Sequence, residues 1–164
     1  HLRQRGRRNI MLLSNTDSKY WSVKTREKGF TDAFPEAEKG TIQLFKQSDN
    51  IEEMRANVRQ LIHDVLIPGG IDGILTPNDL VALLLEGELL SAGLTIPGDI
   101  ALVGFDNEPF SACAQIPITT IDQNNGSIAE YAIRMLLDII QDQNSCHVAR
   151  KISVQPELVI RKTS

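Results

Sequence analysis

Short polar side chains stand at the end of each apolar run in the first 107 residues of this sequence. They occur in four groups: Asn15 to Ser18, Gln47 to Asp49, Asn78-Asp79 and Asp106-Asn107. Carboxylates accept hydrogen bonds and amides both accept and donate them, so such groups suit the hydroxyls of a sugar-like ligand. They could instead cap the helices that follow, which we expect for at least one of Asn78 and Asp79. No helical pattern is evident after Asp106, so a ligand role and a structural role stay equally open for that residue.

Three further candidates lie near the first of these groups. Arg26 falls one turn into a predicted helix, where its guanidinium would offer five donors to vicinal hydroxyls or to a carboxylate. It could also be a solvated helix arginine paired with a nearby carboxylate. Ser22 is the predicted N-cap of this helix. Trp21, the only tryptophan, could stack on a sugar or shield a cleft, or could be a partly exposed packing residue.

No arrangement of residues that would support catalysis is evident. The histidines His1, His63 and His147 have no triad or metal-ligand spacing around them, and Cys113 and Cys146 match no metal or redox motif. The sequence also lacks the GxSxG, GxGxxG and phosphate-loop motifs. We therefore expect neither an enzyme nor a bound metal or cofactor.

An alternation of strands and helices must position these polar groups. Apolar runs bounded by turn residues predict buried strands at 9–13, 41–45, 71–75 and 100–105. The segments between them predict helices that begin near Ser22, after Asp49 or Asn50, and at Leu80. Such alternation is typical of an α/β fold with a parallel sheet and helices on both faces. The carboxyl ends of parallel strands lie at one edge, so the polar groups should converge on one cleft.

The pattern changes in the C-terminal part of the chain. A further strand is predicted at 118–121, and it ends on Asp122, Gln123 and Asn124. Residues 127–140 have the apolar spacing of an amphipathic helix. A polar linker at 141–149 and two short β-runs, at 151–154 and 158–160, complete the sequence.

The composition is that of an ordinary globular protein. The chain has 164 residues, of which 41% are hydrophobic and 23% charged, and its net charge is −4. An acidic chain with few aromatic residues does not suggest a nucleic-acid surface. The basic first eight residues could contact phosphate, but we interpret them as a solvated helix end that leads into the first strand. No apolar stretch approaches the ~18 residues of a membrane span, and two cysteines without a CxxC motif fit a reducing cytoplasm.

Several motifs resemble the LacI/GalR family of bacterial transcriptional regulators, in the family's order and spacing. They are Gly6-Arg7-Arg8-Asn9-Ile10, Arg26-Glu27-Lys28-Gly29-Phe30, Thr76-Pro77-Asn78-Asp79, Ala92-Gly93-Leu94, Ile96-Pro97-Gly98-Asp99-Ile100, Val103-Gly104-Phe105-Asp106-Asn107, Ile118-Thr119-Thr120-Ile121 and Pro156-Glu157-Leu158-Val159-Ile160-Arg161. The resemblance implies a periplasmic-binding-protein-like fold of two α/β lobes with a small-molecule effector between them. It also implies a homodimer, and operator DNA bound through a helix-turn-helix domain that this chain lacks.

The resemblance assigns roles to individual residues. Arg26 and Asp106 match the family's effector-binding arginine and aspartate. Asn78 matches a ligand-contacting position of sugar-responsive members, and Gln123 a position near the hinge strands. Other candidates are Ser22 and Ser48, at positions that vary with the effector, and Cys113, at or near the dimer interface and therefore expected to be buried there.

The resemblance also divides the chain. Residues 1–123 would form the C-terminal lobe, 124–145 a helix and linker crossing to an absent N-terminal lobe, and 146–164 the strands that return. The predicted helix would then expose its apolar stripe unless it packs on its own lobe, swaps with a neighbour or is disordered. A solute-binding protein of a transport system shares this fold class and is the main alternative; a signal peptide upstream would favour it.

Overall fold

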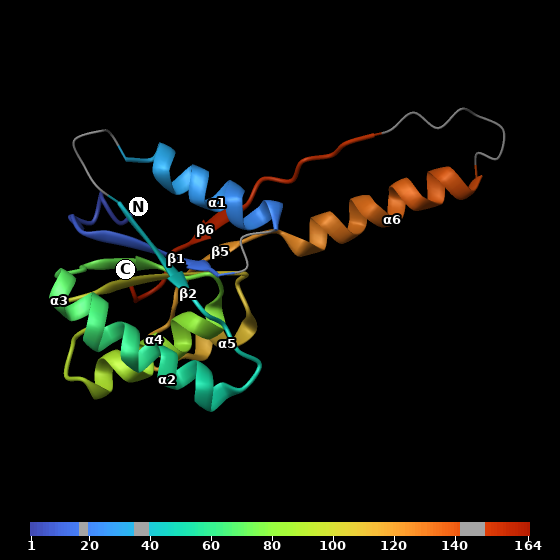
Figure 1. Cartoon of the computed structure of the whole chain (residues 1–164). Helices are drawn as coiled ribbons and strands as arrows, with labels where there is room; N and C mark the ends of the chain where they lie inside the picture. The colour runs from blue at the N-terminus through green and yellow to red at the C-terminus, as the bar shows by residue number, and fades with distance from the viewer. Residues whose placement is uncertain (17–19, 35–39, 142–149) are drawn as a thin grey trace.

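The computed structural model of the chain describes residues 1–16, 20–34, 40–141 and 150–164 (Figure 1). Its strands are β1 (Ile10–Asn15), β2 (Thr41–Phe45), β3 (Gly73–Leu75), β4 (Ala101–Phe105), β5 (Thr119–Asp122) and β6 (Glu157–Val159). Its helices are α1 (Trp21–Asp32), α2 (Ile51–Leu61), the π-helical η1 (Ile62–Leu66), α3 (Ile67–Gly69), α4 (Asp79–Ser91), α5 (Pro109–Cys113) and α6 (Asn125–Gln141).

The six strands form one sheet in the order β2-β1-β3-β4-β5-β6. Strands β1 to β5 are all parallel, which confirms the predicted α/β fold class. Strand β6 is antiparallel to β5, with Thr120 opposite Val159, and was not anticipated in that direction. Helix α6 lies between β5 and β6 in the chain but packs on neither face of the sheet (Figure 1), unlike the crossover helices that join parallel neighbours.

Helices cover both faces of the sheet, with α1 on one face and α2 and α4 on the other (Figure 1). Alternate residues of a strand point to opposite faces. Met11 and Leu13 of β1 accordingly join the larger core cluster with α2 and α4. Ile10 and Leu12 join the smaller cluster, which contains Phe30 of α1. The sheet is therefore buried on both faces, as its continuous apolar strands predict.

Most predicted helix ends are confirmed. The Asn50 side chain accepts hydrogen bonds from the Glu52 and Glu53 N–H groups at the start of α2. Glycines in the left-handed region follow α3 and α4, at Gly70 (φ 59°) and Gly93 (φ 82°). The prediction for Ser22 is wrong: α1 already begins at Trp21, and no side chain caps it.

The basic N-terminal segment has the hydrogen bonds of a helix end. The N–H of Gly6 donates to the Arg3 carbonyl at 3.0 Å, and the N–H of Arg7 donates to the Leu2 carbonyl at 3.0 Å. Gly6 has φ 87°, the left-handed conformation that closes a Schellman motif. The segment is thus a turn of helix-end geometry that leads into β1, but the helix itself is absent: residues 2–6 form turns, and Leu2 is buried.

The C-terminal part departs most from the predictions. Helix α6 forms as expected but has no buried residue, and it projects from the body of the molecule (Figure 1). The strand predicted at 151–154 is wrong, because only the three residues of β6 reach a hydrogen-bonding partner on β5. Most of the predicted linker, with Cys146 and His147, lies outside the described residues. Among the described helices, none has the length and apolar character needed to cross a membrane.

Candidate functional site

Asp106 lies at the carboxyl end of β4, where the chain turns sharply. Asp106 has φ 102° and Asn107 has φ 52°, and neither residue is glycine. Consecutive positive φ values are unfavourable for such residues and persist only where neighbouring groups fix the backbone. The Asp106 side chain is half-buried at this turn. Its carboxylate is thus held in a defined place at the edge where ligands bind to sheets of this kind.

Arg26 reaches the same edge of the sheet from α1. Its guanidinium carbon lies 3.6 Å from the centroid of the Phe105 ring, and its Nη1 donates to the Pro77 carbonyl at 2.8 Å. The side chain is half-buried rather than solvated. Arg26 is therefore not the solvated helix arginine of the second interpretation, and its contact with a ligand stays a prediction.

Burial and charge have opposing effects on the pKa values of Asp106 and Arg26. Burial raises the pKa of the Asp106 carboxyl, while the Arg26 charge and a hydrogen bond from Gln123 lower it in part; the charge of Asp79 raises it further. Burial likewise lowers the pKa of the Arg26 guanidinium, and the Asp106 charge partly opposes this. Both charged groups are thus incompletely solvated. Ligand hydroxyls could donate to the carboxylate and accept from the guanidinium.

Gln123 joins this pair from the segment between β5 and α6. Its Nε2 donates to Asp106 Oδ1 at 2.6 Å. The structure thus brings together three of the predicted site residues, Arg26, Asp106 and Gln123.

Asn78 is occupied by a structural role. Its Oδ1 accepts from the Val81 N–H at 3.0 Å, so it caps α4 as the capping alternative predicts. Its Nδ2 donates to Gln47 Oε1 at 3.1 Å, which links the ends of β2 and β3. A ligand contact by Asn78 stays a prediction.

Arg26 lines two cavities. The smaller, of about 100 Å³, lies at the strand ends and is lined by polar and apolar residues that include Ser14, Ser22, Gln47 and Pro77. The larger, of about 410 Å³, follows the α1 face of the sheet and is mainly apolar. Ser22 therefore shares a cavity with Arg26, although it does not cap α1.

The structure gives Ser48 a structural role and leaves Trp21 exposed. The Ser48 hydroxyl donates to Glu53 Oε2 at 2.6 Å and accepts from the Asn50 N–H at 3.2 Å, so it belongs to the start of α2. Trp21 is 80% exposed, which contradicts its interpretation as a partly exposed packing residue. Their contacts with a ligand stay predictions.

The expectation that Asn107 faces the cleft is wrong. Its Oδ1 accepts from Arg161 Nη2 at 2.6 Å, and its Nδ2 donates to Asp122 Oδ2 at 2.9 Å. A helix, α5, also follows this turn, contrary to expectation. Five residues are too few to give a helical pattern in the sequence, and the contacts of Asn107 depend on residues distant along the chain.

Cys113 lies on α5 and is exposed in this single chain. Its burial in a dimer interface stays a prediction. No group of histidine, cysteine or acidic residues suited to a metal ion occurs in the part of the chain that the structure describes.

The mostly parallel sheet covered by helices on both faces is an α/β fold of the periplasmic-binding-protein-like class. The chain belongs to the periplasmic binding protein-like domain family, whose match covers residues 1–164. This confirms the resemblance to the LacI/GalR regulators, whose effector domain is of that kind.

Curated relatives are repressors. The chain is 30% identical over 163 residues to the HTH-type transcriptional repressor PurR of Photobacterium profundum, covering 99% of this chain and 48% of the relative. PurR of Aliivibrio fischeri (strain MJ11) is 36% identical over 86 residues, which is 52% of this chain and 25% of the relative. The chain thus spans about half the length, or less, of the curated relatives it matches.

Solved structures agree. A LacI family transcriptional regulator from Lactobacillus casei with bound glucose has a TM-score of 0.78 at 30% identity, over 99% of this chain and 58% of that one. A periplasmic binding protein/LacI transcriptional regulator from Alkaliphilus metalliredigens QYMF, complexed with D-xylulofuranose, has a TM-score of 0.80 at 26% identity, over 99% of this chain and 59% of that one. These relatives are regulators and binding proteins rather than enzymes.

Proposed function

We propose that this chain is the effector-binding and dimerisation part of a bacterial DNA-binding transcriptional regulator, with a sugar or sugar derivative as effector. The observation that carries this proposal is the half-buried Asp106 carboxylate beside Arg26 at the strand ends. Support comes from the PurR relatives and from the L. casei regulator, which was solved with glucose.

The chemistry of the pair suits a polyhydroxyl ligand. A carboxylate accepts from two neighbouring hydroxyls, and Arg26 keeps further N–H donors beyond the one given to Pro77. The Phe105 ring lies 3.6 Å from the guanidinium carbon, a cation–π contact that helps to hold Arg26 in place. A ligand with adjacent hydroxyls can therefore meet both charges at once.

The proposed mechanism is a shift between two lobe arrangements. Residues 1–123 supply one wall of the cleft, 124–145 cross to a second lobe, and 146–164 return to the first. An effector changes the balance only if it binds one arrangement more tightly than the other. The homodimer passes that preference to operator DNA through a helix-turn-helix domain outside this sequence, in the cytoplasm.

Calorimetry on the longer regulator tests the effector assignment. Mono- and disaccharides, including glucose and sucrose, are titrated, with nucleobases as a comparison class. We expect Asp106→Ala to abolish sugar binding while circular dichroism shows an intact fold. Undiminished sugar affinity in this variant would overturn the assignment. The isolated chain should bind weakly or not at all, because the second wall of the cleft belongs to the other lobe.

The dimer assignment has its own test at Cys113. In a Cys146→Ser background, a thiol reagent should react rapidly with the exposed Cys113 in dilute protein and slowly at concentrations where sedimentation shows a dimer. Equal reactivity in both states would place the interface elsewhere. Our alternative, a transport solute-binding protein, is not favoured, because the curated relatives reported above are repressors.

A further inference from the structure

A second aspartate lies beneath the Asp106 turn. Asp79 is the first residue of α4, and its side chain has no exposed surface. A buried carboxylate requires strong hydrogen-bond donors, since its transfer from water is otherwise costly. The partners of Asp79 therefore show what this charge stabilises.

Both oxygens of Asp79 serve the turn that carries Asp106. Oδ2 accepts from the backbone N–H of Glu108 at 2.8 Å. Oδ1 accepts from the hydroxyl of Thr120 at 2.6 Å. The same hydroxyl oxygen accepts from the N–H of Asn107 at 3.3 Å. Because its proton is given to Asp79, the Thr120 hydroxyl presents a lone pair to Asn107.

The turn is held at three successive N–H groups. The N–H of Asp106 donates to the carbonyl of Ile121 on the neighbouring strand β5 at 2.9 Å. The next two, on Asn107 and Glu108, depend on Asp79, one through Thr120 and one directly. These are the contacts that fix the two positive φ values at Asp106 and Asn107.

The position of Asp79 also explains why residue 104 is a glycine. A Cβ at Gly104 of β4 would collide with Asp79 Oδ1. Glycine therefore lets the carboxylate pass close to the strand that ends in Asp106.

We propose that Asp79 is a positioning residue, which sets the Asp106 carboxylate at the strand ends by anchoring the Asn107 and Glu108 N–H groups. The role of the Asp106 carboxylate in ligand binding, on which this inference depends, rests on the proposed function. A purely structural role for Asp79, as an acidic residue in the first turn of α4, would require neither Thr120 nor the turn.

Amide hydrogen exchange on this chain tests the anchor without any ligand. Thr120→Val removes the bridging hydroxyl and keeps the side-chain shape, while Thr120→Ser retains the hydroxyl. We expect exchange of the Asn107 N–H to be about tenfold faster in the valine variant and nearly unchanged in the serine variant. Asp79→Asn cannot accept from both donors and should accelerate exchange at Asn107 or Glu108.

The core amide of Ile74, fully buried in β3, serves as the control. Acceleration confined to the turn supports the proposal. Unchanged exchange of the Asn107 and Glu108 amides in both Thr120→Val and Asp79→Asn would overturn it. An equal acceleration at Ile74 in Thr120→Val would also overturn it, because the whole fold would then be opening.

The Asp106 carboxyl gives a second readout, by carbon NMR during a pH titration. Release of the turn should expose this group and move its pKa back towards the ordinary value in Thr120→Val but not in Thr120→Ser. An identical titration in both variants would reduce Asp79 to a structural role. Neither experiment uses an effector, so failed sugar binding would overturn the proposed function alone, and failure here would leave that function standing.

Discussion

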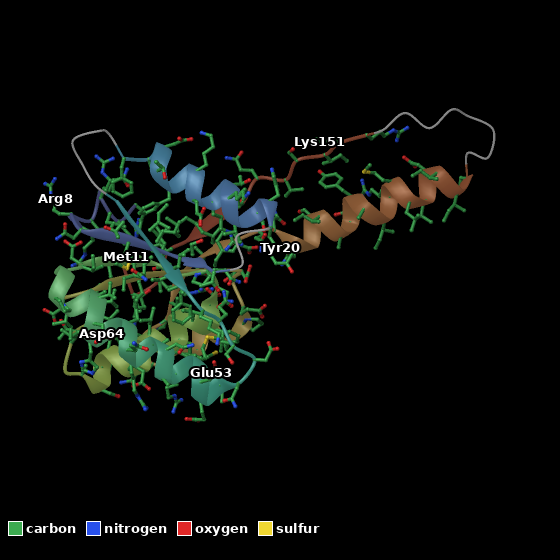
Figure 2. All side chains as sticks on the ribbon, viewed as in Figure 1. Arg8, Met11, Tyr20, Glu53, Asp64 and Lys151 are labelled. Carbon is green, nitrogen blue, oxygen red and sulfur yellow. The ribbon has the colours of Figure 1, made fainter. Side chains whose placement is uncertain are left out.

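Helices α4 and α6 are both rich in apolar residues, and both begin beside Asp106, yet only α4 is packed. Leu85 and Leu89 of α4 have no exposed surface. On α6 no residue is buried, and Leu136 is 56% exposed. Figure 2 shows the side chains of α6 standing away from the body of the molecule. An apolar face indicates that a helix packs against something, but it does not identify the partner.

The difference separates two sources of helix stability. Helix α4 is stabilised by burial against the sheet and α2, where each large side chain contributes about 1.5–3 kcal/mol. Helix α6 depends on its own backbone hydrogen bonds and on exposed pairs such as Arg134 with Glu130. Such pairs contribute only about 0.3–0.5 kcal/mol each. The two helices should therefore respond very differently to substitution.

The largest expected effect is in the core of α4. Leu85→Ala should lower the free energy of unfolding by about 2–5 kcal/mol, because it leaves a cavity in the larger cluster. Urea denaturation measures this loss. Leu80→Ala, on the exposed side of the same helix, is the matched control and should cost much less. Equal losses at the two positions would contradict the packing of α4.

The next effect concerns Gln123, in the segment just before α6. Gln123→Ala removes the donor to Asp106, and a hydrogen bond to a charged group contributes about 1.5–3 kcal/mol. We expect sugar affinity of the longer regulator to fall by about tenfold, measured by calorimetry. Gln141→Ala, at the far end of α6, should leave the affinity unchanged. A similar loss from both changes would mean that α6 acts as a whole rather than through Asp106.

Low pH should weaken sugar binding at Asp106. Burial raises the pKa of Asp106, so this carboxylate takes up a proton at a higher pH than an ordinary aspartate. Sugar affinity should fall as the pH drops through that pKa, because the protonated group no longer accepts from two hydroxyls. Calorimetry at several pH values checks this, and Asp106→Asn should lack the change.

The raised pKa of Asp106 has the opposite consequence for stability: low pH weakens sugar binding but favours the folded chain. A carboxyl whose folded pKa is raised binds protons more readily in the folded chain, so its stabilising contribution is present at low pH and is lost above the folded pKa. Asp106→Asn should therefore raise the melting temperature slightly at neutral pH. A lower melting temperature would mean that the charge itself stabilises the turn.

The smallest expected effect is on α6. Leu136→Ala should change the free energy of unfolding of this chain by no more than about 0.5 kcal/mol, since the side chain loses no packing. In the longer regulator, where we propose that α6 crosses to a second lobe, the same change should cost several-fold more. An equally small cost there would argue against the proposed division at residue 124.

Local patterns predicted much of the fold. The apolar run of β4 and the caps Asn50 and Asn78 depend on neighbours within a few residues, and the structure confirms them. Segments that need a distant partner were predicted poorly. Residues 151–154 have β propensity but form no strand, because no strand lies beside them.

The sequence by itself determined the order of the elements, the edge where polar residues gather, and Arg26 and Asp106 as candidates there. Those features follow from periodicity, caps and the ends of strands. Only the tertiary structure decided that Asn107 turns to Arg161, 54 positions away, and that Asp79 holds Glu108, 29 positions away. Such contacts depend on how strands align in the sheet, which no local pattern encodes. Asp106 and Arg26 were therefore predictable as neighbours at this edge, and the residues that hold the Asp106 turn were not.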